Sequence, residues 1–161
     1  MPARISIRQT PSRRSRSARL ALDLQIASRG VRVPARARFR RWARAALGRS
    51  GEITVRVVGA AEARRLNRRY RGRDYATDVL AFAYDASRDS VHGDLVLCAP
   101  VIAREALEQG KTLEAHFAHL TVHALLHLQG YDHAATRDAA RMEARERKLL
   151  AKLGYPDPYA G

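Results

Sequence analysis

Short strand-like segments recur through the first hundred residues of the chain, and this recurrence constrains the fold more than any other feature. Residues 20–26 and 53–57 alternate between apolar and more polar side chains, a period typical of a strand with one buried face. Residues 79–84 and 94–98 are almost continuously apolar and predict buried strands. A chain with four such segments is expected to build a sheet.

Helical patterns separate these strands and dominate the rest of the chain. They are expected at residues 34–47, 61–70, 100–110, 113–128 and 135–153. Pro34 and Pro100 can each open a helix, and Gly110 can end one. We therefore predict an α+β fold, in which a small mixed β-sheet of about four strands packs against about five helices in a single domain. The order of the strands cannot be derived from these patterns.

Positive charge is concentrated at the start of the chain. Residues 1–50 hold fourteen Arg and one acidic residue, whereas residues 51–161 hold sixteen basic and fifteen acidic residues. We expect residues 1–19, rich in Arg, Ser and Pro, to form a basic, flexible arm before a folded domain at residues 20–161. Such asymmetry favours a polyanionic partner, nucleic acid rather than a membrane surface.

Hydropathy and cysteine content both favour the cytoplasm. No apolar run approaches the ~20 residues of a membrane helix, so we expect no membrane partner. Cys98 is the single cysteine, which excludes an intrachain disulfide and fits a reducing compartment. Since it ends an apolar segment, Cys98 is predicted to be a core residue rather than a catalytic thiol.

Histidines cluster at residues 116–133, where five of the six in the chain are found. His123 and His127 lie four residues apart, so on a helix they project from one face and can bind one ion. Gly130 can end that helix in a left-handed conformation, and the turn can bring His133 to the same ion. Three histidine ligands leave one coordination position open, as in catalytic zinc sites. We predict one zinc ion per chain at the end of a central helix, although imidazole also suits nickel, copper and iron.

The other polar residues of this stretch have alternative roles. His116 lies about 10 Å along the helix from His123, too far for the same ion. His119 could line the cleft or support a metal ligand from behind, but for both histidines an ordinary hydrogen-bonded or exposed side chain is favoured. Asp132 could orient a ligand imidazole or simply form the turn.

The residue after the first histidine limits the chemistry. Zinc proteases with this histidine spacing need Glu there as general base, and this chain has Ala124. RNA phosphodiester cleavage is an alternative in which a metal ion and a cation can stabilise the developing negative charge. Spacing alone does not select the cation among the candidate arginines, which are Arg64, Arg65, Arg68, Arg69, Arg71 and Arg73.

Three segments resemble one known family. HALLHLQGYDH at residues 123–133, LNRRYRGRDYATDVLAF at residues 66–82 and GDLVLC at residues 93–98 are similar to motifs of the YbeY family of rRNA maturation factors. The resemblance runs from about Ala61 to Tyr159. The chain departs from the family pattern in having Ala124 in place of the usual glycine, and alanine at position 81, where serine is frequent.

The resemblance implies a metal-dependent endoribonuclease that acts on single-stranded RNA, in 16S rRNA 3′-end maturation and ribosome quality control. It implies that His123, His127 and His133 are the zinc ligands and that Arg71 is the important cation. Arg71 and His123 are therefore candidate catalytic residues. The expected partners are 16S rRNA and ribosomal particles, with no small-molecule cofactor. Cleft positions of the family are matched by Asn67, Asp74, Thr77 and Asp78.

Two other functions stay open at this point. One is a non-enzymatic ribosome-assembly factor in which the metal is structural. The other is a zinc hydrolase or protease that lacks the usual glutamate base.

Overall fold

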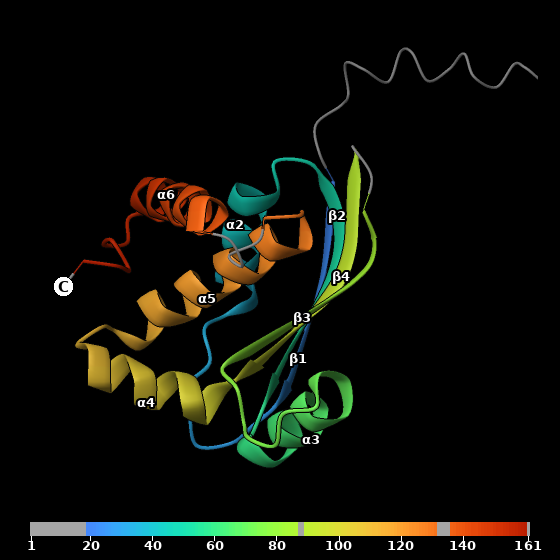
Figure 1. The fold of residues 1–161 in the computed structure, drawn as a ribbon, viewed down its shortest axis with the longest axis vertical. Coiled ribbons are helices and arrows are strands. Elements are labelled where there is room, and N and C mark those ends of the chain that lie inside the picture. The colour runs from blue at the N-terminus through green and yellow to red at the C-terminus, as the bar shows by residue number, and fades with distance from the viewer. Residues whose placement is uncertain (1–18, 87–88, 132–135, 161) are drawn as a thin grey trace, which may run out of the picture.

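The computed structural model describes residues 19–86, 89–131 and 136–160 (Figure 1). In chain order the elements are β1 (Leu20–Ala27), α2 (Arg36–Leu47), β2 (Ser50–Val58), α3 (Ala60–Arg71), β3 (Val79–Ala86), β4 (Ser90–Cys98), α4 (Ala99–Gln109), α5 (Leu113–Leu128) and α6 (Thr136–Leu153). These elements confirm the predicted α+β class. The expected arm at residues 1–19 lies outside the described residues except for Arg19, so its flexibility stays a prediction.

The sheet is mixed and has the strand order β1-β2-β4-β3. β1, β2 and β4 run parallel, whereas β3 runs antiparallel to β4 and forms one edge. α5 packs against this edge strand. The edge position of β3 therefore places its backbone directly beside the helix that carries most of the histidines.

Helices cover the two faces of the sheet unequally (Figure 1). α2, α5 and α6 lie on one face and form the main core, which contains Trp42, Phe117, Leu125 and Leu150. α3 lies on the opposite face, over a smaller cluster that contains Val58, Ala63, Leu80 and Val96. α5 is the central helix, since eleven of its sixteen residues are buried.

Gly93 of β4 allows the end of α5 to approach the sheet closely. A Cβ at this position would lie 2.8 Å from Leu128 Cδ1 and 2.8 Å from the carbonyl oxygen of Phe82. Such distances are too short for packed atoms, so a larger residue would push the last turn of α5 away from the sheet. This contact fixes the turn that carries His127 relative to β3.

Several local expectations are tested by the structure. Gly130 has a φ of 97° just beyond α5, as predicted, and Cys98 is a buried free thiol in the core. Pro34 does not open α2, because the helix begins two residues later with Ala35 in the capping position. Within the part of the chain that is described, no helix combines the length and hydropathy needed to cross a membrane.

Candidate metal centre

One face of α5 carries three histidines. His119, His123 and His127 repeat every four residues, so they follow one another along this face. The rings of His119 and His123 have their centroids 6.1 Å apart. The first two side chains are partly buried and His127 is exposed. These three histidines thus form a stripe that runs from the edge of the core out to solvent.

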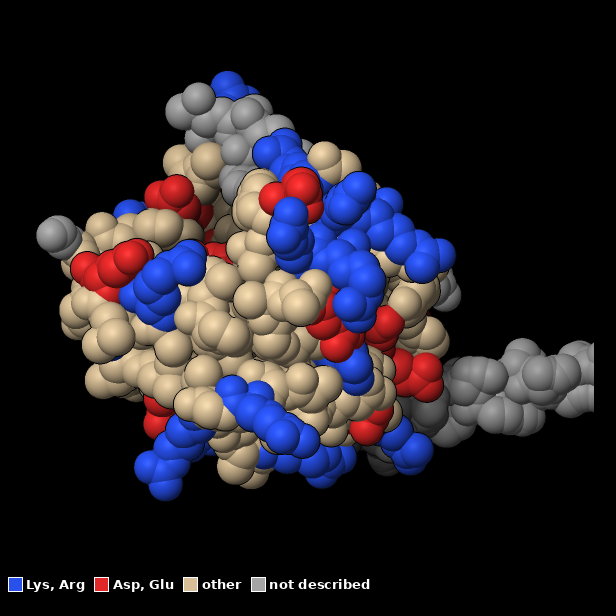
Figure 2. All heavy atoms as spheres, turned by 90° about the horizontal axis from the view of Figure 1, so that it is seen from below, with Lys and Arg blue, Asp and Glu red and all other residues tan. Residues whose placement is uncertain are grey.

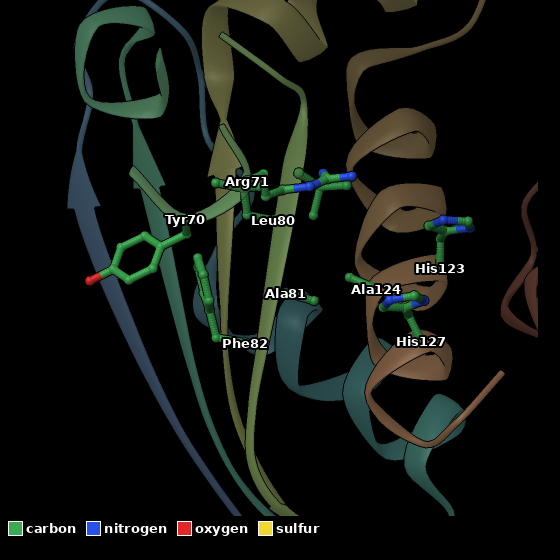
Figure 3. Close-up of a pocket in the computed structure, with 9 residues that line it drawn as sticks. Tyr70, Arg71, Leu80, Ala81, Phe82, His123, Ala124 and His127 are labelled. Carbon is green, nitrogen blue, oxygen red and sulfur yellow. The ribbon is translucent and has the colours of Figure 1, made fainter. Parts of the chain in front are cut away.

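A pocket of about 390 Å³ lies beside this stripe, between α5 and β3 (Figure 3). His123 and His127 line it from α5, residues 79–82 line it from β3, and Tyr70 and Arg71 line it from the end of α3. Figure 3 shows the Arg71 side chain extending toward α5, whereas the Tyr70 ring points away from α5. The pocket therefore brings a guanidinium group and two imidazoles to one cavity.

Two sets of hydrogen bonds hold the end of α3 in place. Gly72 adopts a left-handed conformation with a φ of 69°, its N–H donates to the carbonyl oxygen of Arg68, and the N–H of Arg73 donates to that of Asn67. Asn67 is buried, and its Nδ2 donates to the carbonyl oxygen of Tyr75 at 2.9 Å. Both contacts tie the loop after α3 to the helix. As a result, Arg71 leaves the last turn of α3 in a defined direction.

Other arginines of α3 have different surroundings. Arg64 donates two hydrogen bonds to Asp74, at 2.7 and 3.0 Å, and this hydrogen bonding lowers the pKa of that carboxyl group. The guanidinium group of Arg69 lies 5.3 Å from the centre of the Tyr70 ring. Among the arginines of this helix, Arg71 is the one that lines the pocket.

Glu146 of α6 is a fully buried carboxylate that joins the histidines to the C-terminal segment. One oxygen accepts from His123 Nδ1 at 2.7 Å. The other accepts from His119 Nε2 at 2.9 Å and from the Tyr159 hydroxyl at 2.5 Å. Burial opposes ionisation, but these hydrogen bonds outweigh it and lower the pKa of Glu146 to about 2. Burial and the neighbouring carboxylate raise the pKa of Tyr159, which keeps its hydroxyl a donor.

The ionised Glu146 fixes the tautomer of His123. A carboxylate can only accept, so Nδ1 of the imidazole must carry the proton. The nitrogen suited to binding a metal is then Nε2. Pairs of this kind, in which a carboxylate orients a histidine from behind, are general features of metal sites.

The spacing of these side chains decides which of them suit a metal ion as ligands. One potential ligand atom from each of His119, His123 and Glu146 lies within 4.8 Å of the others, and such a group could hold an ion. The His–Glu distances of 2.7 and 2.9 Å are hydrogen-bond lengths. Two ligand atoms at ~2.0–2.1 Å from a tetrahedral ion would instead be about 3.3 Å apart. Glu146 therefore fits the role of orienting His123 better than that of a direct ligand.

Comparison with known proteins decides the family. The chain matches the family model described as Endoribonuclease YbeY over residues 31–154. The chain belongs to the endoribonuclease YbeY family. This confirms the resemblance seen in the three sequence motifs.

Curated YbeY relatives are similar over almost their whole length. The chain is 61% identical to Endoribonuclease YbeY of Aromatoleum aromaticum, over 89% of this chain and 95% of the relative. It is 55% identical to Endoribonuclease YbeY of Paraburkholderia phytofirmans, over 90% and 99%. Among solved structures, the solution structure of TM1509 from Thermotoga maritima matches with a TM-score of 0.49 and 20% identity, over 86% of this chain and 99% of that one.

The structure describes some of the site residues that were predicted from the sequence and leaves others outside the described residues. His123 and His127 line the same pocket as Arg71. His133 and Asp132 lie outside the described residues, so the set of three zinc ligands stays a prediction. His119 is hydrogen-bonded, as expected, but its partner is the carboxylate that also holds His123.

His116 has a different carboxylate partner, although its ring centroid lies 6.0 Å from that of His119. It contacts Glu105 at 2.9 Å, and burial lowers its pKa to about 4, so the ring is neutral at physiological pH. Asp78 lies in the same region, where burial and Glu105 raise its pKa. Its Oδ1 accepts from the backbone N–H of Val79 at 2.7 Å. Neither residue lines the pocket that contains Arg71.

Glu146→Gln is expected to weaken the binding of a metal ion at His123 by about 10- to 100-fold, the usual effect of removing a group that orients a metal ligand. The amide keeps the size of the carboxyl group but cannot accept from His119, His123 and Tyr159 together. The zinc dissociation constant, measured by competition with a chelator, tests this. Glu143→Gln is the matched control, because Glu143 lies one turn earlier on α6 and is partly exposed. Equal zinc affinity in both variants would contradict the orienting role.

Proposed function

We propose that this protein is a zinc-dependent endoribonuclease that cuts single-stranded RNA, with a role in 16S rRNA 3′-end maturation and ribosome quality control. The observation that carries the proposal is that Arg71, His123 and His127 line one pocket in a chain of the endoribonuclease YbeY family. The curated relatives are named endoribonucleases. The expected site of action is the cytoplasm, on ribosomal particles.

Each pocket residue has a defined task in this proposal. His123 and His127, together with His133, would hold the zinc ion, and Glu146 would keep the His123 ring in the binding orientation. When bound, the ion supplies Lewis-acid charge beside a phosphate oxygen. Arg71 lies across the pocket, where its planar guanidinium can contact phosphate oxygens in pairs and stabilise negative charge as it develops.

Charge on the surrounding surface favours an RNA substrate. Figure 2 shows Lys and Arg side chains gathered on the α3 side of one face of the molecule. Cations attract phosphates without regard to base sequence, and the resulting affinity falls as salt rises. We propose that the arginines of residues 1–19 add to this affinity.

The protease alternative is disfavoured by the environment of the nearest carboxylate. Ala124 stands where zinc proteases carry their general base. Glu146 lies close to the histidines, but it is fully buried, accepts three hydrogen bonds and has a pKa near 2. A carboxylate so strongly stabilised in its ionised form is a poor proton acceptor.

Metal removal tests the proposal directly. Protein loaded with zinc is expected to cut a labelled single-stranded RNA that carries the 3′ end of 16S rRNA, and to leave the matching duplex largely intact. A chelator should abolish the cutting, and added zinc should restore it. Binding without cutting, in every metal tested, would instead favour the assembly-factor function.

A further inference from the structure

An exposed aromatic pair lies where α3 meets β3. Tyr70 and Phe82 meet edge to face, with ring centroids 5.2 Å apart. Phe82 packs against the smaller core cluster under α3, so it anchors the pair. Tyr70 is 56% exposed, and its ring is flanked by the guanidinium group of Arg69. Tyr70 is thus held in position by its neighbours while much of its apolar surface remains in water.

This pair separates two pockets. Tyr70 and Phe82 line both the metal-site pocket and a second pocket of about 460 Å³ on the sheet face next to α3. In Figure 3 the Tyr70 ring points away from α5, toward that second side. A polymer that leaves the metal-site pocket across the end of α3 must therefore pass the Tyr70 ring.

The polar groups of the second pocket suit a base better than a phosphate. Glu62 makes two hydrogen bonds to Arg56, at 2.7 and 3.0 Å. Asp94 accepts a hydrogen bond from the Tyr84 hydroxyl. Arg56 balances the charge of Glu62, so Asp94 leaves this pocket with a net negative charge that would repel a phosphate. An uncharged aromatic base meets no such repulsion and finds the Tyr70 ring at the entrance.

Positive charge surrounds the ring on the α3 side. Arg68, Arg69, Arg71 and Arg73 are all exposed within three residues of Tyr70. Proteins that bind single-stranded nucleic acid combine such cations with aromatic rings on which bases stack. These charges favour a single-stranded nucleic acid as the occupant, and the proposed function makes it RNA.

We propose that Tyr70 stacks an unpaired base of the RNA strand whose phosphate lies beside Arg71. The inference rests on the proposed endoribonuclease function. Every base has a π-face, so the contact tolerates any sequence. It requires a base that is free of its own helix, which gives Tyr70 a part in discriminating single strands from duplexes.

The test uses zinc-loaded protein and a single-stranded RNA that carries 2-aminopurine next to the cleaved position. Stacking quenches 2-aminopurine fluorescence, and rapid mixing records this before cleavage. Tyr70→Ala is expected to raise KM about 10-fold, to leave kcat within about twofold and to remove the quenching. Tyr70→Phe should keep all three near wild type, because the ring remains. Tyr75→Ala is the matched control, since Tyr75 is 51% exposed but lines neither pocket.

The outcomes separate this inference from the proposed function. The stacking site would be overturned if wild-type protein cut RNA and Tyr70→Ala showed the same KM and the same quenching as wild type. The proposed endoribonuclease function would not be affected by that result. A loss confined to kcat would mean that Tyr70 acts by positioning Arg71, and this also overturns the inference. An equal loss in Tyr70→Phe would exclude stacking in favour of the hydroxyl. A wild type that neither binds nor cuts RNA would refute the proposed function itself.

Discussion

Protein that carries His127→Ala is expected to lose bound zinc and RNA cleavage together while it remains folded. His127 is exposed at the last turn of α5, so its loss removes no buried side chain. A catalytic metal ion contributes several kcal/mol of transition-state stabilisation, so the rate should fall about 1000-fold or more. Zinc per chain, kcat/KM on single-stranded RNA and the thermal midpoint measure the three parts of this prediction.

His123→Ala is expected to have the same effect on zinc and cleavage, with an added cost in stability. Its ring donates to the fully buried Glu146, which would lose one of three donors. An incompletely satisfied buried group costs about 1–3 kcal/mol in the free energy of unfolding. His92→Ala is the control, because His92 is partly exposed on β4 and lies in a different pocket. Retention of full zinc and full activity by both α5 variants would contradict the proposed site.

The positions of the elements could be predicted because they depend on local periodicity. The alternation at residues 20–26 and the helical pattern at residues 113–128 both correspond to elements with nearly the same bounds. The order β1-β2-β4-β3 depends on which strands pair, and no local pattern carries that information. The pocket itself was therefore beyond prediction, because it exists only where β3 forms the edge beside α5.

Only the part of the site that lies on a single helix could be predicted from the sequence. His123 and His127 share a helix, so their spacing places them together. Glu146 comes from α6 and meets them only through tertiary packing. One signal was present: Glu146 falls on the buried face of α6 with Met142 and Leu150, and a charge at a core position usually has a buried partner. The sequence does not show which residues pair with Glu146.

Arg71 was selected from six neighbouring arginines by resemblance alone, and its place in the pocket makes its role testable. Arg71→Ala is expected to lower kcat about 100- to 1000-fold, the usual loss when one group that stabilises developing charge is removed. Zinc content should not change, since a guanidinium group is not among the usual zinc ligands. Stability should change by less than about 0.5 kcal/mol, because the side chain is exposed.

Two further variants distinguish stabilisation of the transition state by Arg71 from electrostatic attraction of the RNA substrate. Arg71→Lys keeps the charge but loses the planar pair of donors, so its kcat should lie between those of wild type and Arg71→Ala. Arg68→Ala removes an exposed arginine of the same helix that does not line the pocket, and it should weaken RNA binding without lowering kcat. If Arg71→Ala behaved like Arg68→Ala, with its loss confined to KM, Arg71 would only attract the substrate. A selective fall in kcat requires contact with the phosphate during cleavage, and among the arginines of α3 it is Arg71 that lines the pocket.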